Sequence, residues 1–196
     1  STIPSGPIIS ESSGAKAQNR TYQDMLKNPT DEANFELLSS SELYKVDLMG
    51  NKTLFKAVDI YANESFSPDG QYILVTTIKR PFSYIVPLNR FPQFTTVYDL
   101  EGKLIKTVNE LALNEVLPKG FMAVHQGKRY INWRSDVGAS LYYVVALDKG
   151  DPKVEVENRD ALYSWDAPFD KEPLLLTKTK LRYSNVIWGD KTTAIL

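Results

Sequence analysis

Short runs of alternating apolar and polar residues recur in pairs along this chain. In the first pair, residues 43–46 and 54–57 flank a turn that contains Asp47 and Gly50. Alternation with a period of two is typical of a strand with one buried face. Glycine adopts the positive φ of a tight turn without the steric penalty of a Cβ atom. The pattern therefore predicts an antiparallel β-hairpin.

This hairpin pattern is repeated further along the chain. A second copy joins residues 96–99 to 103–108, and a third joins residues 142–147 to 153–156. The turn of each copy carries an aspartate that corresponds to Asp47, and successive aspartates are about 50 residues apart. A repeat of this length indicates the blades of a β-propeller. We interpret each hairpin as the outer two strands of a blade.

A different pattern marks the inner strands. Residues 65–75 contain two apolar runs around Pro68-Asp69-Gly70, and weaker copies occur at 123–130 and 185–191. Proline cannot donate a ladder hydrogen bond, so it is best tolerated where a strand ends. Asp-Gly is a common turn between two paired strands. Each copy therefore predicts a pair of strands joined by a turn.

The order of these strands predicts an all-β fold: an incomplete β-propeller over residues 42–196, with about three blades of four-stranded antiparallel sheets. It would contain the outer half of one blade, two full blades at about 64–108 and 122–157, and the start of another. A closed propeller typically has four to eight blades. We therefore expect a piece of a larger protein, whose open blade edges could pair between copies of the isolated chain.

The beginning of the chain follows neither pattern. Residues 1–41 are predicted to form an irregular N-terminal arm with one short helix. Thr21 would cap this helix and Asp24 would interact favourably with its N-terminal dipole. Asn28-Pro29 would end it.

Composition narrows the classes of function. The chain has 196 residues, of which 42% are hydrophobic, and a net charge of −1, so nothing signals a nucleic-acid partner. There is no cysteine, and no apolar run reaches the ~20 residues of a membrane span. No phosphate-binding glycine loop or metal motif occurs, so we expect no cofactor and no metal. The sequence does not determine the cellular compartment, and we favour a periplasmic or exported location over the cytoplasm.

Three blocks of unusual composition suggest a family. They are residues 20–32, residues 80–92 with Arg80-Pro81-Phe82 and Arg90-Phe91-Pro92, and residues 133–148 with Trp133-Arg134-Ser135-Asp136. Together they resemble the amino-terminal propeller of glutamyl endopeptidase-like serine peptidases, of the prolyl oligopeptidase superfamily. The resemblance implies a C-terminal α/β-hydrolase domain in the same protein and a peptide substrate. It also implies that the propeller gates and helps to shape the active-site cavity.

The chain itself offers little for catalysis. Gly138-Ala139-Ser140 lacks the second glycine of a nucleophile elbow and falls between strands. His125 is the one histidine, and a solitary histidine is more often a hydrogen-bonded structural residue than a base. We therefore expect no catalytic residue here, and a serine nucleophile elsewhere in the protein. The alternative function is a protein- or glycan-binding propeller with no attached enzyme.

Residues 79–94 are the best candidate for recognition, because this connection is far longer than a hairpin needs. Its aromatic residues Phe82, Tyr84 and Phe91 could cover the edge of a blade, meet the hydrolase domain, or contact substrate. We favour the first two roles over the third.

Three arginines are candidates for an acidic specificity. If the protein cleaves after glutamate, Arg80, Arg90 or Arg134 could bind the substrate carboxylate through two parallel hydrogen bonds. Structural salt bridges, or a pocket supplied wholly by the hydrolase domain, remain open as alternatives.

Overall fold

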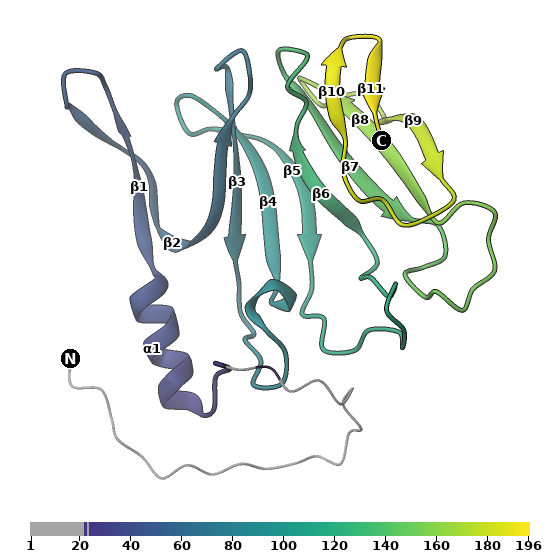
Figure 1. Ribbon diagram of the computed structural model, residues 1–196. Helices are drawn as coiled ribbons and strands as arrows, with labels where there is room; N and C mark the ends of the chain where they lie inside the picture. Colours follow the sequence, from purple (N-terminus) through teal and green to yellow (C-terminus); the bar gives the residue numbers. More distant parts are fainter. Residues whose placement is uncertain (1–21, 23) are drawn as a thin grey trace. The chain divides into compact units, whose positions relative to one another are not determined.

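The computed structural model describes residue 22 and residues 24–196, and the regular secondary structure of these residues is mostly β-strand (Figure 1). In chain order the elements are α1 (Pro29–Ser39), β1 (Ser41–Val46), β2 (Lys52–Phe66), β3 (Tyr72–Ile78), a 3₁₀ turn (Leu88–Arg90), β4 (Gln93–Asp99), β5 (Leu104–Leu111), β6 (Lys128–Trp133), β7 (Ser140–Ala146), β8 (Asp160–Asp166), β9 (Leu174–Thr179), β10 (Ile187–Asp190) and β11 (Thr193–Ile195). The expectation of a β chain with one short helix is confirmed for this part of the chain.

The strands form three sheets. One has the order β1-β2-β3-β4-β5, the second has the order β6-β7-β8-β9, and the third is the pair β10-β11. Neighbours in each sheet are consecutive in the chain, and the pairings of β1 with β2 and of β6 through β9 are antiparallel. Short turns rather than crossover connections therefore link most strands.

The chain divides into two compact units. Unit 1 comprises the described residues up to Asn63, together with Thr76–Phe94 and Glu110–Val116. Its core contains Ile60, Ile78, Phe82, Val86 and Phe91, with Phe35 of α1 packed against them. The Phe35 ring meets Phe82 and Phe91 edge-on, with centroids 5.0 and 5.9 Å away. The aromatic residues of the long connection thus hold α1 in place.

Unit 2 comprises Glu64–Val75, Thr95–Asn109 and Leu117–Leu196. Its main core is rich in aromatic residues: Leu74, Val97, Val108, Trp133, Leu141, Tyr143, Trp165 and Phe169. A second cluster packs Val144 and Leu162 against Tyr183 and Val186. The strands that place these residues also end at the turns that line the candidate site.

The first two predicted hairpins are confirmed. In the first, Tyr44 pairs with Leu54 and Val46 with Lys52. The Asp47 carboxylate accepts hydrogen bonds from two turn amides, those of Met49 and Asn51, at 2.8 and 2.9 Å. The aspartate of the repeat therefore holds its own turn closed.

The third predicted hairpin is wrong in its second strand. Residues 153–156 form no strand, and β7 pairs instead with β8, with Tyr143 opposite Tyr163. The reason lies in Asp148, which is completely buried and binds arginine side chains as well as its own turn. The connection from β7 to β8 is therefore longer than in the other two copies. Of the two strands expected within 123–130, the first is absent and the second is the start of β6 at Lys128.

The predicted helix lies in the wrong place. Thr21 falls outside the described residues, and the described residues from Asp24 to Lys27 are not helical. Asn28-Pro29 begins α1 instead of ending a helix. The Asn28 side chain accepts a hydrogen bond from the Asp31 amide at 2.9 Å, and Pro29 occupies the first helical position, where the missing N–H is not needed.

Candidate functional site

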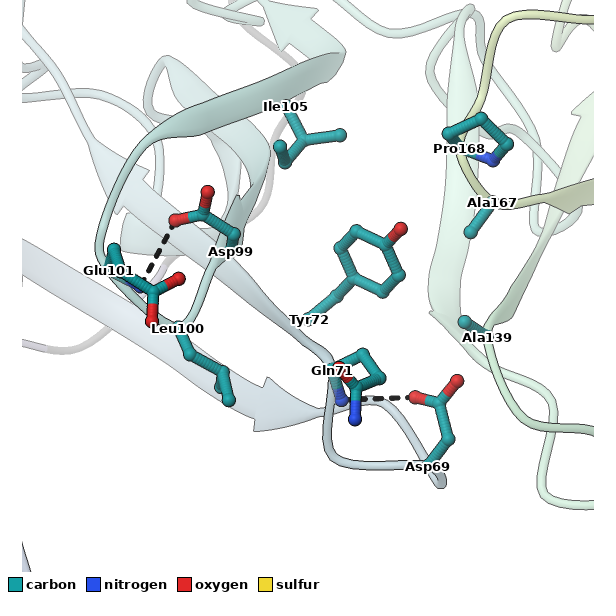
Figure 2. A pocket seen from close by; sticks show the side chains of 10 residues that line it. All are labelled: Asp69, Gln71, Tyr72, Asp99, Leu100, Glu101, Ile105, Ala139, Ala167 and Pro168. Carbon is teal, nitrogen blue, oxygen red and sulfur yellow. Dashed lines mark hydrogen bonds between the residues drawn. The ribbon is translucent and has the colours of Figure 1, made fainter.

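A cavity of about 690 Å³ lies in unit 2, at the ends of several strands (Figure 2). The lining residues come from four turns or strand ends: Asp69, Gln71, Tyr72, Asp99, Leu100, Glu101, Ile105, Ala139, Ala167 and Pro168. This volume lies in the range of small-molecule sites. The Tyr72 side chain stands in the middle of the group, with Asp99 and Glu101 to one side and Ala167 and Pro168 to the other (Figure 2).

Two of the three carboxylates in the cavity wall hold turns. Asp69 Oδ1 accepts hydrogen bonds from Ser67 Oγ at 2.6 Å and from the Gln71 amide at 3.1 Å. Asp99 Oδ1 accepts from the amides of Glu101 and Lys103 at 3.1 and 2.8 Å. Backbone amides therefore fix the positions of these two charges at the rim of the cavity.

The ionisable side chains of this wall are three carboxylates and the Tyr72 phenol. The wall includes no serine, threonine, cysteine, histidine or lysine, so it lacks the nucleophile and the imidazole base of a serine or cysteine peptidase. Within the described part of the chain, Asp69, Asp99 and Glu101 form no salt bridge. The arrangement can donate and accept hydrogen bonds and carries a negative rim.

Ser140 and His125, the serine and the histidine considered for catalysis, each make a hydrogen bond to another group. Ser140 is buried, and its hydroxyl shares a hydrogen bond of 2.8 Å with Ser164. His125 Nδ1 lies 2.8 Å from the Gln126 carbonyl oxygen. Burial lowers the pKa of His125, which favours the neutral ring. Neither residue is arranged as half of a nucleophile–base pair.

Among the described residues, no group of three or more potential metal ligands occurs. The same part of the chain has no helix that is long and apolar enough to cross a membrane.

Arg80 lies in unit 1 and is held by two acidic residues of α1. Its Nε and Nη2 atoms donate to the two carboxylate oxygens of Glu36 at 2.9 and 2.7 Å, and its Nη1 binds Glu32. Tyr84 donates to the other oxygen of Glu32 at 2.5 Å. A substrate carboxylate would have to displace Glu36 from Arg80.

The recognition candidates on the same connection differ in exposure. Phe82 and Phe91 are buried and stack on each other with centroids 5.5 Å apart. Tyr84 is 38% exposed. The two phenylalanines therefore act as core residues of unit 1, and Tyr84 is the aromatic residue of this set that reaches solvent.

Arg90 also belongs to unit 1. Its guanidinium carbon lies 5.9 Å from the centroid of the Tyr22 ring. In residue 22 and residues 24–196, no carboxylate lies within salt-bridge distance of it. Of the three arginines, Arg90 is the one without an acidic partner in this part of the chain.

Arg134 lies in unit 2 and has a full set of partners. It binds both carboxylate oxygens of Asp136, at 3.1 and 2.6 Å, and donates to Ser164 Oγ at 3.2 Å. Its guanidinium carbon lies 4.4 Å from the centroid of the Trp188 ring. The hydrogen bond from Arg134 lowers the pKa of Asp136. Arg134 and Trp188 line a smaller cavity of about 230 Å³.

Unit 2 also contains a buried network of ion pairs that the sequence did not indicate. Arg182 binds Asp148 at 2.6 Å and Asp160 at 3.0 Å. Arg129 binds Asp160 at 2.5 Å, and Arg159 binds Asp148 at 2.8 Å. Neither carboxylate is accessible to solvent, so this network is a structural element of unit 2.

The cavity residues carried a partial signal in the sequence. Asp69 and Asp99 belong to the two turn patterns, which predicted their turns but gave no reason to expect a common cavity. Tyr72, Ala139 and Pro168 had no distinguishing pattern. The cavity arises from the packing of segments that are distant in sequence.

Comparison with known proteins identifies relatives over the whole length of the chain. It is 37% identical over 198 aligned residues to a protein of Oryza sativa subsp. japonica named "Probable glutamyl endopeptidase, chloroplastic". It is 36% identical over 197 residues to a protein of the same name from Arabidopsis thaliana. These alignments cover 100% and 99% of the chain but 21% and 20% of the relatives. No family model and no solved structure matches. The chain is thus similar along its whole length to about one fifth of two proteins named as glutamyl endopeptidases.

Proposed function

We propose that this chain is a non-catalytic β-propeller segment of a glutamyl endopeptidase-like serine peptidase of the prolyl oligopeptidase superfamily. The observation that carries the proposal is the 36–37% identity along 99–100% of the chain to two proteins named as glutamyl endopeptidases. Similarity that extends over every strand supports a shared fold for this segment. The activity belongs to the whole protein, of which this segment contributes one part.

The strand arrangement supports the propeller part of the proposal. The β6-β7-β8-β9 sheet is a four-stranded antiparallel meander, which is the form of a propeller blade. The strands β2 to β5 follow each other in the same consecutive order. Propeller blades repeat this unit, and the aspartate turns at Asp47 and Asp99 have the same hydrogen-bond pattern.

In this proposal the segment gates and shapes the cavity in which peptides are cleaved. The serine nucleophile and its partners lie in a C-terminal α/β-hydrolase domain of the same protein. The engagement of Ser140 by Ser164, and of His125 by its neighbouring carbonyl group, supports a location outside these residues. The propeller restricts entry to peptides and extended segments.

Arg90 is our candidate for a contact to a substrate glutamate. Arg80 and Arg134 are already bound to carboxylates, whereas Arg90 has none within salt-bridge distance in the described residues. A guanidinium group that binds a carboxylate through two hydrogen bonds discriminates strongly against an uncharged side chain.

The test uses the full-length protein encoded by the gene that contains this chain. We expect it to cleave a fluorogenic peptide with glutamate before the scissile bond faster than the matched glutamine peptide, and to react with a fluorophosphonate probe. Absence of both cleavage and labelling would reject the peptidase and favour the binding module without an enzyme.

The role of Arg90 is tested separately in the same protein. Arg90→Ala should lower the ratio of kcat/KM for the glutamate and glutamine peptides by roughly tenfold or more, since the bidentate contact is lost. Arg80→Ala and Arg134→Ala are the matched controls and should leave this ratio unchanged. An unchanged glutamate preference in all three variants would reject the assignment of specificity to this segment.

A further inference from the structure

Two lysine ammonium groups lie against one indole ring in unit 2. Lys106 of β5 and Lys128 of β6 place their Nζ atoms 5.0 and 4.8 Å from the centroid of the Trp165 ring on β8. Lys128 Nζ is also 5.0 Å from the centroid of the Tyr143 ring and donates a hydrogen bond of 2.6 Å to the Val108 carbonyl oxygen. Two strands thus bring two positive charges to an aromatic side chain of a third strand.

Among the residues that the structure describes, these two charges have no acidic partner within salt-bridge distance. In the described part of the chain, every salt bridge of unit 2 involves an arginine, and none involves Lys106 or Lys128. The nearby Glu172 acts on the Tyr143 phenol but lies beyond salt-bridge distance of both lysines.

The like charges also oppose each other. Burial, followed by the positive charge of Lys106, lowers the pKa of Lys128. The aromatic faces of Trp165 and Tyr143 compensate for part of this cost through cation–π attraction. A negative charge close to both ammonium groups would reduce the repulsion and supply a counter-charge.

We propose that Lys106 and Lys128 form a binding site for a carboxylate, supplied by an acidic side chain of a peptide or by a small free carboxylic acid. Each ammonium group can donate a charge-assisted hydrogen bond to a carboxylate oxygen. Inorganic phosphate is the competing anion, and the test below compares it with the carboxylate. This site does not depend on the proposed peptidase function.

The test follows the indole N–H resonance of Trp165 by NMR in the 196-residue chain. This N–H donates to the Lys171 carbonyl oxygen at 2.7 Å, so it reports on the immediate surroundings of the ring. At constant ionic strength, N-acetyl-glutamate amide should shift the resonance in a saturable way, with a Kd on the order of 1–10 mM. N-acetyl-glutamine amide should not shift it. Acetate distinguishes a site for free carboxylates from one that needs the peptide unit.

Variants identify the residues responsible. Lys106→Met should weaken the binding of N-acetyl-glutamate amide roughly tenfold, as expected for loss of a charge-assisted hydrogen bond. Lys103→Met, on the same hairpin, is the control and should bind like the unmodified chain. If Lys128→Met does not fold, Lys128→Arg should retain binding, because the charge is kept.

Several results would overturn the proposal. They are the absence of a saturable shift, an equal shift with the glutamine compound, tighter binding of inorganic phosphate than of the glutamate compound, or full affinity in Lys106→Met. A tenfold gain in affinity in Glu172→Gln would also overturn it, because Glu172 would then be the counter-ion of the lysines in solution.

Discussion

Arg182 donates a hydrogen bond from Nη2 to Oδ2 of Asp148 at 2.6 Å, across 34 positions of sequence. Asp148 has no exposed surface, and its other oxygen accepts a hydrogen bond from the Gly150 amide at 3.0 Å. The same carboxylate thus closes its own turn, like Asp47 and Asp99, and in addition anchors a distant arginine. The third copy of the repeat has acquired a role in the core of unit 2.

This difference predicts unequal effects of the same substitution at two repeat positions. Asp148→Ala should lower the free energy of unfolding by about 3 kcal/mol, because it removes the buried carboxylate that Arg182 and Arg159 share and leaves Arg182 with Asp160 as its one acidic partner among the described residues. Asp47→Ala is the matched control at an exposed turn and should have a clearly smaller effect. Urea unfolding of both variants measures the difference. Equal losses would show that the Arg182 pair adds nothing to the turn.

The same pair predicts a loss of stability in acid. Burial alone would raise the pKa of Asp148, but the hydrogen bonds from Arg182 and Arg159 outweigh it, and the pKa is lowered. A lowered pKa in the folded state means that the pair stabilises the fold above the unfolded value of about 3.9. This stabilisation is lost as the pH falls below about 4 and through the folded pKa.

Urea unfolding at pH 7 and pH 3 measures this effect. The difference in the free energy of unfolding between the two pH values should be smaller in Asp148→Asn than in the unmodified chain, since asparagine does not titrate. An identical difference in the two proteins would assign the acid sensitivity to other carboxylates, such as Asp136.

Local patterns were sufficient to predict the parts of the fold that depend on local interactions. The hairpins around Asp47 and Asp99 are closed by hydrogen bonds over two and four residues, and period-two alternation marked their strands. At Asp148 the local sequence looks the same, and the carboxylate binds its own turn, but it also binds Arg159 and Arg182. No local pattern encodes such a pair. The sequence therefore predicts the second strand of this hairpin at residues 153–156, whereas the strand that pairs with β7 is β8, Asp160–Asp166.

The same limit applies to the candidate arginines. Glu36 holds Arg80 from 44 residues away, and only the fold brings α1 beside that connection. The prediction that Asn28-Pro29 ends a helix was wrong for another reason. Proline is common both just after the end of a helix and at its first position, so the dipeptide alone does not distinguish the two. The hydrogen bond from the Asp31 amide to the Asn28 side chain decides between the two.

That hydrogen bond predicts the effect of removing the cap. Asn28→Ala should destabilise unit 1 by about 1 kcal/mol, because the Asp31 amide loses its acceptor at the start of α1. Asn34→Ala, inside α1, is the matched control and should be neutral or stabilising, since alanine has the higher helix propensity. Hydrogen exchange of the α1 amides resolves the effect locally. Equal exchange in the two variants would contradict the capping role of Asn28.

The edge of the five-stranded sheet predicts self-association of the chain. β1 lies at the end of the strand order, and Val46 on this strand is 57% exposed. Unpaired edges with apolar side chains favour pairing between copies, and a charge on the edge opposes it. Sedimentation velocity should therefore show dimer in the unmodified 196-residue chain at high concentration.

Val46→Glu should shift the chain toward monomer. Val58→Glu on the interior strand β2, where the valine is 63% exposed, should shift it less. A purely monomeric unmodified chain would count against edge pairing, and an equal effect of the two substitutions would point to association through a sheet face instead.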